Sequence, residues 1–483
     1  MWRLLPFAVV ATLCLPACAG SEASRGPYNN GDAGAEAASD TDASDAEADS
    51  WITPDGPTES GADGAPDADA SPVDADEPES HPTVLTGVLV GGAGEFPGGI
   101  GGVRYRSGGL TGVTSATGEF DYELGEPVVF GVADVDFLPT PGAALVSPWQ
   151  LAGNGGCAQS AELERLLVLL QSLDDDEDPS TGTHIATYPE GSPNRSLGAL
   201  SDIDVANLIE QLISGRTPVA ADVAVHRFIS QMDGELWTQL SMDTFDTVSS
   251  AIRSQGVVSD GTFWYFSWRL GLDKTDQQYN DVTKNNLAIP PLMALQGSDH
   301  IGDIDYWNGK LYVPIEDSNG YDNPNVVLYD TELNAGAQFP VPSSLLTEGV
   351  PWVAVDGPRA SVYLAEWDPT PSILVFSLAD ISYQREIPLS TTLGRIQGAK
   401  VFEGALYANA DDDGKTVYKI NLETGTVMEL FAFHQNFEAE GLAFLDRPDG
   451  SRLHTLNATP SATAMEFRHH QRTREPLRKA VCN

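Results

Sequence analysis

The chain has 483 residues, of which 70 are acidic and 26 are Lys or Arg, so its formal net charge at pH 7 is -44. This length exceeds what one compact domain normally uses, so we expect several domains. A charge this negative argues against binding to nucleic acid, and against binding to an anionic bilayer through a basic surface of the protein.

The first 18 residues have the layout of a bacterial export signal. Arg3 precedes an apolar stretch from Leu4 to Leu15, which is too short to cross a membrane as a stable helix. Leu15-Pro16-Ala17-Cys18 resembles the lipobox of bacterial lipoproteins, whose Cys receives diacylglycerol. The resemblance implies a lipid anchor on Cys18 in a bilayer. Because Ala19 and not Asp follows, it also implies the outer membrane of a Gram-negative bacterium. The alternative is an ordinary secretory signal.

Residues 19–80 are predicted to form a disordered acidic linker. The first 80 residues carry 17 acids and two basic residues, with almost no aliphatic bulk. Such a segment cannot bury enough apolar surface to offset its ordering entropy, and its charges repel one another. A calcium-binding repeat is the alternative, but the Asp spacing is irregular. Residues 81–483 keep 53 acids against 24 basic residues, so the folded part is also acidic.

Residues 83–148 show short β-rich runs with Gly-rich turns every eight to twelve residues, which predicts a small β-sandwich. The runs include Gly102-Val103-Arg104-Tyr105, Gly118-Glu119-Phe120-Asp121-Tyr122 and Gly125-Glu126. They resemble the prealbumin-like or Ig-like module found near the N-terminus of many bacterial surface lipoproteins. The resemblance implies a spacer or display role.

Residues 149–242 change to helical periodicity. Ser160 can cap one helix, and Ser201 with Asp204 forms a capping box before another. Five consecutive acids follow Leu173, and three of them, Asp174, Asp176 and Asp178, alternate as in a calcium loop. However, Pro179 and Ile185 replace the turn glycine and the bidentate Glu of such a loop. A calcium site and a solvated acidic loop are therefore both open.

The C-terminal half contains a repeat. Turn signals at Asp260-Gly261, Asn308-Gly309, Pro358, Glu403-Gly404 and Asp449-Gly450 are each followed by an aromatic residue or His, at steps of 47, 51, 44 and 47 residues. A period near 47 with paired strands is typical of a β-propeller. Residues 249–483 accommodate five such units, with six as the alternative. The fold class expected is mainly β and multidomain: a sandwich, a short helical region and a five-bladed propeller.

Polar residues precede each of these turns, on the strands expected to line the central channel. Alternate residues on a strand share one face, so these side chains should converge on the axis. We predict a ligand-binding set of this kind, with a cation held by Asp303 and Glu440. The alternative is that these polar side chains only satisfy the strand ends and bind water in the channel. The set comprises His300, Asp303, Asp305, Trp352, Gln397, Glu438 and Glu440.

Two functions follow. The favoured one is a membrane-anchored envelope lipoprotein, expected as a monomer, whose propeller binds a polysaccharide or protein at its channel face and which is not an enzyme. The alternative is a calcium-dependent hydrolase, since Glu440-Gly441-Leu442 resembles the "EGL" step of propeller lactonases and phytases.

Two further features leave alternatives open. Cys157 and Cys482 can pair in an oxidising envelope or remain apart. The basic run from Arg468 to Arg474 can neutralise the protein's own acids, fray, or dock a partner.

Overall fold

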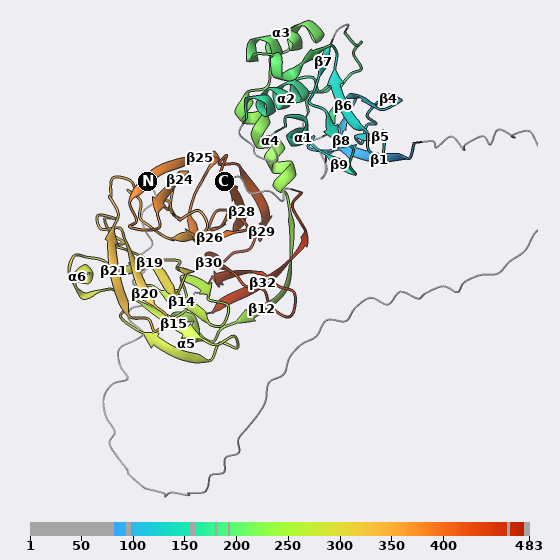
Figure 1. Ribbon diagram of the computed structural model, residues 1–483. Helices are drawn as coiled ribbons and strands as arrows, with labels where there is room; N and C mark the ends of the chain where they lie inside the picture. Colours follow the sequence, from blue (N-terminus) through green and yellow to red (C-terminus); the bar gives the residue numbers. More distant parts are fainter. Residues whose placement is uncertain are drawn as a thin grey trace, which may run out of the picture. The chain divides into compact units, whose positions relative to one another are not determined.

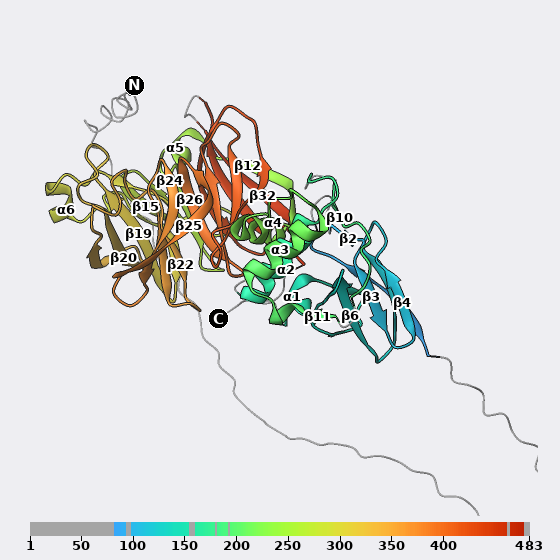
Figure 2. The ribbon, with the colours of Figure 1, turned by 90° about the horizontal axis from the view of Figure 1, so that it is seen from above.

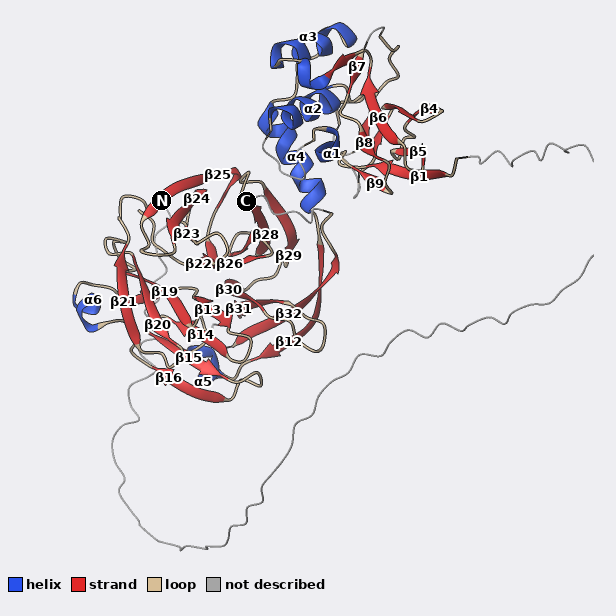
Figure 3. Ribbon diagram, viewed as in Figure 1, coloured by secondary structure: helices blue, strands red, loops and turns tan. Residues whose placement is uncertain are grey.

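The computed structural model of the protein describes residues 82–92, 98–153, 160–178, 181–191, 194–460 and 464–477. The expected signal peptide and linker lie outside the described residues, as do Cys18, Cys157 and Cys482. The fold is mainly β, as expected (Figure 3). No helix in the described ranges is long and apolar enough to cross a membrane.

The first described region is a β-sandwich. One sheet has the order β5-β1-β9, and the other has the order β11-β7-β6-β3-β4, with β8 on β6. The aromatic rings of Phe120 and Phe130 meet edge to face in its core, with centroids 4.9 Å apart. Its strands are β1 (Val84–Leu89), β2 (Ile100–Gly101), β3 (Arg104–Ser107), β4 (Leu110–Val113), β5 (Glu119–Glu123), β6 (Pro127–Val132), β7 (Val135–Asp136), β8 (Thr140–Pro141) and β9 (Leu145–Val146).

Short helices follow the sandwich strands. The expected caps are present: the Ser160 hydroxyl accepts from the backbone of Leu163, and Ser201 and Asp204 form a capping box. Helix α2 packs against both α3 and α4 (Figure 2). The elements are α1 (Pro148–Leu151), α2 (Ala161–Ser172), β10 (Thr183–His184), β11 (Arg195–Ser196), the 3₁₀ turn η1 (Leu197–Ala199), α3 (Asp202–Leu212) and α4 (Ala221–Asp233).

Five antiparallel sheets then form a propeller around one axis (Figure 1). The first blade contains β13 (Gly256–Ser259), β14 (Trp264–Trp268), β15 (Gly271–Thr275) and β16 (Asp281–Asn285). The second contains β17 (His300–Ile301), β18 (Asp305–Trp307), β19 (Lys310–Glu316), β20 (Asn325–Asp330) and β21 (Ala335–Pro340). The third contains β22 (Ala354–Asp356), β23 (Ser361–Leu364), β24 (Thr370–Ser377) and β25 (Tyr383–Leu393).

The fourth blade contains β26 (Ile396–Phe402), β27 (Ala405–Ala410), β28 (Thr416–Asn421) and β29 (Val427–Ala432). The fifth contains β30 (Glu438–Phe444), β31 (Leu453–Ala458), β32 (Met465–Arg474) and β12 (Leu236–Thr244). Two short helices, α5 (Thr247–Ala251) and α6 (Pro291–Leu295), lie outside the sheets. The five sheets confirm the expectation of five blades over six.

Local sequence explains the repeat. The turns Asn308-Gly309 and Glu403-Gly404 have positive φ at both positions, which is the backbone of the tight hairpin turn that these residue pairs favour. Each of the five turns joins the first strand of a blade to the second. The aromatic residue or His after each turn lies on that second strand and is buried, and the five are Tyr265, Tyr312, Tyr363, Tyr407 and His454.

The fifth blade closes the ring with a strand from far earlier in the chain. Strand β12 begins inside 149–242, the range expected to be helical, but it pairs antiparallel with β32. The propeller therefore begins at Leu236 and not at 249. The expectation failed because the partner of β12 is more than 200 residues away, and nothing local to β12 signals that pairing.

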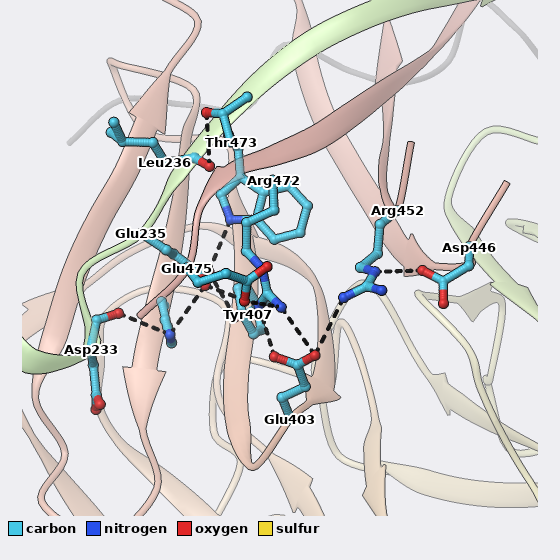
Figure 4. Close-up of polar contacts among 12 residues, drawn as sticks. Asp233, Glu235, Leu236, Glu403, Tyr407, Asp446, Arg452, Arg472, Thr473 and Glu475 are labelled. Atoms are coloured by element: carbon cyan, nitrogen blue, oxygen red, sulfur yellow. Dashed lines mark hydrogen bonds and ion pairs between the residues drawn. The ribbon is translucent and has the colours of Figure 1, made fainter. Parts of the chain in front are cut away.

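A buried carboxylate fixes this closure. Glu235, directly before β12, accepts hydrogen bonds from Trp237 Nε1 (2.9 Å) and from the hydroxyl of Tyr407 (2.7 Å). It also pairs with Lys419 (3.4 Å) and Arg472 (3.3 Å). Figure 4 shows Arg472 between Glu235 and Glu403.

The basic run belongs to β32 and is largely buried. Arg472 contacts Glu403 at 2.7 Å and Glu475 at 2.7 Å, and Arg468 contacts Glu466 at 2.5 Å. The run thus neutralises the protein's own acids. It does not fray.

Candidate functional site at the propeller axis

Three inner strands meet at the axis with almost no space between their backbones. A Cβ atom on Gly398 would lie 2.6 Å from the Cα of Gly441, and one on Gly441 would lie 2.8 Å from the Cα of Gly256. Any side chain at these positions would force β13, β26 and β30 apart. Glycine is therefore required for the close approach.

Asp303 fills the space that these glycines leave. Its Oδ1 accepts from the backbone of Val257 (3.0 Å), and its Oδ2 accepts from the backbone of Ala399 (3.1 Å). The Lys400 ammonium also donates to Oδ2. The Asp303 carboxylate, which has no exposed surface, thus joins three blades. It forms a hub that closes the axis.

The hub explains why Asp303 does not fit a calcium ion. Calcium needs several free oxygen ligands, whereas both oxygens of Asp303 already receive N–H donors, one of them cationic. Burial raises the pKa of Asp303 to about 7, although the Lys400 charge acts in the opposite direction. Asp305 is also occupied, since it accepts from the backbones of Val355 (2.7 Å) and Tyr306 (2.8 Å).

Glu438 and Glu440 lie close enough for their charges to interact, and Gln397 is on the neighbouring strand β26. Gln397 directly precedes Gly398, and Glu440 directly precedes Gly441, where the two strands touch. Among the described residues, the side chains of these three make no hydrogen bond or ion pair. We call them the open set.

Glu440 is the most unusual member of the open set. It is 3% exposed, and burial together with Glu438, Asp411 and Asp303 raises the pKa of its carboxyl group well above the ordinary range. Burial and Asp411 likewise raise the pKa of Glu438. No oxygen of Glu438 or Glu440 is among the buried polar atoms that lack a hydrogen bond, so these carboxyl groups keep contact with solvent. Carboxyl groups with a raised pKa at such a position are candidates for a functional site.

His300 is held in place by neighbours on both ring nitrogens. Its Nδ1 lies 2.9 Å from Glu316 Oε1, and its Nε2 lies 2.7 Å from Gln255 Oε1. Gln255 also accepts at its backbone oxygen from Gly441, next to Glu440. His300 is therefore a neighbour of the open set, but its nitrogens are already engaged.

Trp352 lies elsewhere. It is fully buried in the apolar core between the third and fourth blades, and its backbone forms an isolated bridge with Asp303. A ligand at the channel face does not reach its ring. The structure therefore brings together Asp303, Gln397, Glu438 and Glu440, with His300 beside them, and leaves Trp352 in the core.

Sequence reasoning did not assign two residues to this site: it did not consider Lys400, and it interpreted Asp411 as a solvated loop residue. Lys400 supplies the charge that neutralises Asp303, and Asp411 accepts from the backbone of Ala439 at 3.0 Å, between the two glutamates of the open set. One signal was available: Lys400 is the one charged residue on the inner strand β26, and a buried cation needs a partner.

The acidic loop of the first region was the second predicted metal site. Asp174, Asp175 and Asp176 have carboxylate oxygens within 4.8 Å of one another. Asp178 contributes its backbone instead, donating to Asp176 at 2.9 Å, and Thr181 donates to the other oxygen of Asp176 at 2.7 Å. The cluster in the structure therefore has Asp175 in the place expected for Asp178.

Comparisons with known proteins give a limited result. No protein-family model matches the chain, and no curated protein matches it. Among solved structures, glutaminyl cyclase from Myxococcus xanthus is similar at 11% identity and a TM-score of 0.36, over 50% of this chain and 98% of that one. Hydrazine synthase from Kuenenia stuttgartiensis is similar at 14% identity and a TM-score of 0.29, over 43% of this chain and 56% of that one.

Proposed function

We propose that the protein is an envelope lipoprotein that binds a polymer or protein ligand at the channel face of its propeller. The lipobox-like Cys18 would carry the outer-membrane anchor, and the acidic segment 19–80 would serve as a leash. One observation supports the binding role above all: the open set places three polar side chains without partners beside the closed axis.

The open set is not needed for the fold. Asp303 and Lys400 already join the inner strands, and no described residue hydrogen-bonds to the side chain of Gln397 or Glu440. Polar groups kept free beside a rigid framework are typical of a binding site. Because the hub fills the axis, the ligand would rest on the face and would not pass through the ring.

A calcium-dependent hydrolase receives less support from the same residues. Asp303, one of the two expected axial ligands, is occupied by Lys400 and two backbone N–H groups. We therefore propose binding as the function of the channel face.

The binding role can be tested with immobilised full-length protein and a panel of bacterial envelope polysaccharides and peptides. We expect Gln397→Ala to weaken the interaction at least fivefold, because it removes an amide that faces the ligand. Gln338→Ala, on the exposed outer strand β21, is the matched control and should bind as the unsubstituted protein does. Equal binding by Gln397→Ala, Glu440→Gln and the control would place the site elsewhere.

The anchor needs its own test. Labelling of cells with a fatty-acid analogue should tag the protein, and Cys18→Ala should abolish the label and release the protein from the membrane fraction. Label retained by the Cys18→Ala variant would contradict the proposed anchor.

A further inference from the structure

We propose that the channel face binds an amino sugar, whose protonated primary amine lies against Glu438 and Glu440. This inference rests on the proposed function and names the chemical class of the ligand. It follows from the charges around the open set, from the spread of its carboxyl groups and from the side chains at its edge.

The first step is the balance of charge. Three acids face this part of the axis, namely Asp411, Glu438 and Glu440. Asp411 has its own cations, since Lys415 contacts it at 2.6 Å and Arg395 at 3.8 Å. Lys400 is committed to Asp303. Lys415 also lowers the pKa of Glu438 through its charge, but within the described chain no cation forms an ion pair with Glu438 or Glu440. A cationic group of the ligand would supply that ion-pair partner.

The second step separates an organic cation from a metal ion. Among the described residues, the one group of three or more acidic, His or Cys side chains with ligand atoms within 4.8 Å is Asp174, Asp175 and Asp176. Glu438, Glu440 and Asp411 are therefore too spread to surround one ion. An ammonium group needs no closed shell, because its three N–H donors can reach separate carboxyl oxygens.

The third step concerns the rest of the ligand. The Gln397 amide is free to pair with a hydroxyl group. The segment of the half-buried Trp367 adjoins that of Asp411, because the backbone carbonyl of Trp367 accepts from Arg395, and the carbonyl of Arg395 accepts from the backbone of Asp411. A free amide and a partly exposed indole on segments that adjoin the acidic residues suit a sugar ring, which offers hydroxyl groups and an apolar face.

A matched pair of oligosaccharides tests the inference by calorimetry on the full chain. The glucosamine tetramer carries amines, and the N-acetylglucosamine tetramer has the same rings without the positive charge. We expect binding of the first and at least tenfold weaker binding of the second. Glu438→Gln and Glu440→Gln should each weaken binding of the glucosamine tetramer about tenfold. Glu429→Gln, an exposed change on β29, should leave binding unchanged.

The outcomes separate this inference from the proposed function. If the acetylated tetramer binds equally well, and Gln397→Ala weakens it while Glu440→Gln does not, the amine assignment is wrong and the channel-face function stands. If a lysine-rich peptide binds and the glucosamine tetramer does not, the sugar assignment is wrong. If a tetramer binds and none of the three variants changes its affinity, both proposals fail.

Discussion

Two buried glutamates of the propeller have opposite surroundings. Glu235 has a fully buried side chain and accepts from Trp237, Tyr407 and Arg472, with Lys419 also in contact. Glu440 is almost as buried and has no hydrogen-bond or ion-pair partner in the described chain. Burial alone therefore does not distinguish a structural carboxylate from one at a site.

The difference lies in what each carboxyl group joins. Glu235 connects the segment before β12 to the fourth blade and to β32, so it stabilises the closure of the ring. Glu440 joins nothing, and its acidic neighbours make its charged form more costly. Replacing the first should therefore cost stability, whereas replacing the second should cost binding.

The largest expected effect comes from Glu235→Ala. It leaves the Lys419 ammonium buried without an anionic partner, whereas Arg472 keeps Glu403 and Glu475. Breaking a buried ion pair costs about 3–5 kcal/mol. The free energy of urea unfolding, followed by tryptophan fluorescence, should fall by that amount. The exposed change Glu429→Gln should leave it within about 0.5 kcal/mol. A loss below 1 kcal/mol in the Glu235 variant would contradict the role in closure.

Asp303→Ala should have the next largest effect and lower the free energy of unfolding by about 3 kcal/mol, because it leaves the Lys400 ammonium buried at the axis without an anionic partner. The double variant Asp303→Ala with Lys400→Met removes both charges and should recover part of the loss. A double-mutant cycle with both single variants measures the coupling. Additive effects would show that the two side chains do not depend on each other.

Two histidines extend the comparison to buried groups that are kept neutral. Burial lowers the pKa of His454 and of His470 from 6.5 to about 3. Above pH 6.5 both histidines are neutral in the folded and in the unfolded chain. As the pH falls from 6.5 toward 3, only the unfolded chain gains these protons, so the free energy of unfolding falls by about 1.4 kcal/mol per pH unit for each histidine. His470→Phe should flatten the fall in urea midpoint over this range.

The control for this experiment is His434→Phe, at an exposed position in the loop between β29 and β30. It should keep the full acid sensitivity. An unchanged slope in the His470 variant would mean that this histidine accepts a proton without disturbing its blade.

Glu440→Gln should have the smallest effect on stability, and with the opposite sign. Because the pKa of Glu440 is higher in the folded protein than the 4.5 of the unfolded chain, its contribution to stability is fully present below pH 4.5. This contribution is lost as the pH rises through the folded pKa. The variant removes this loss, so its free energy of unfolding should equal that of the unsubstituted protein near pH 4 and exceed it at pH 9. Destabilisation at pH 9 would mean that Glu440 has a structural partner.

Part of the fold could be predicted because its signals are local. The period near 47 residues and the dipeptides Asn308-Gly309 and Glu403-Gly404 indicated the hairpins, and Ser201 with Asp204 indicated a helix start. Strand β12 was missed, because its pairing with β32 spans most of the described chain. At the site, the position of Asp303 on an inner strand was predictable, but its partner on another blade was not.

The sequence by itself determined where strands, turns and caps form, because these depend on residues a few positions apart. Only the tertiary structure decided which buried charges are neutralised. Lys400 reaches Asp303 across 97 residues and Tyr407 reaches Glu235 across 172. Such contacts exist only after the blades close around the axis. The same closure leaves Glu440 without a partner, since no cation of the neighbouring strands is left to reach it.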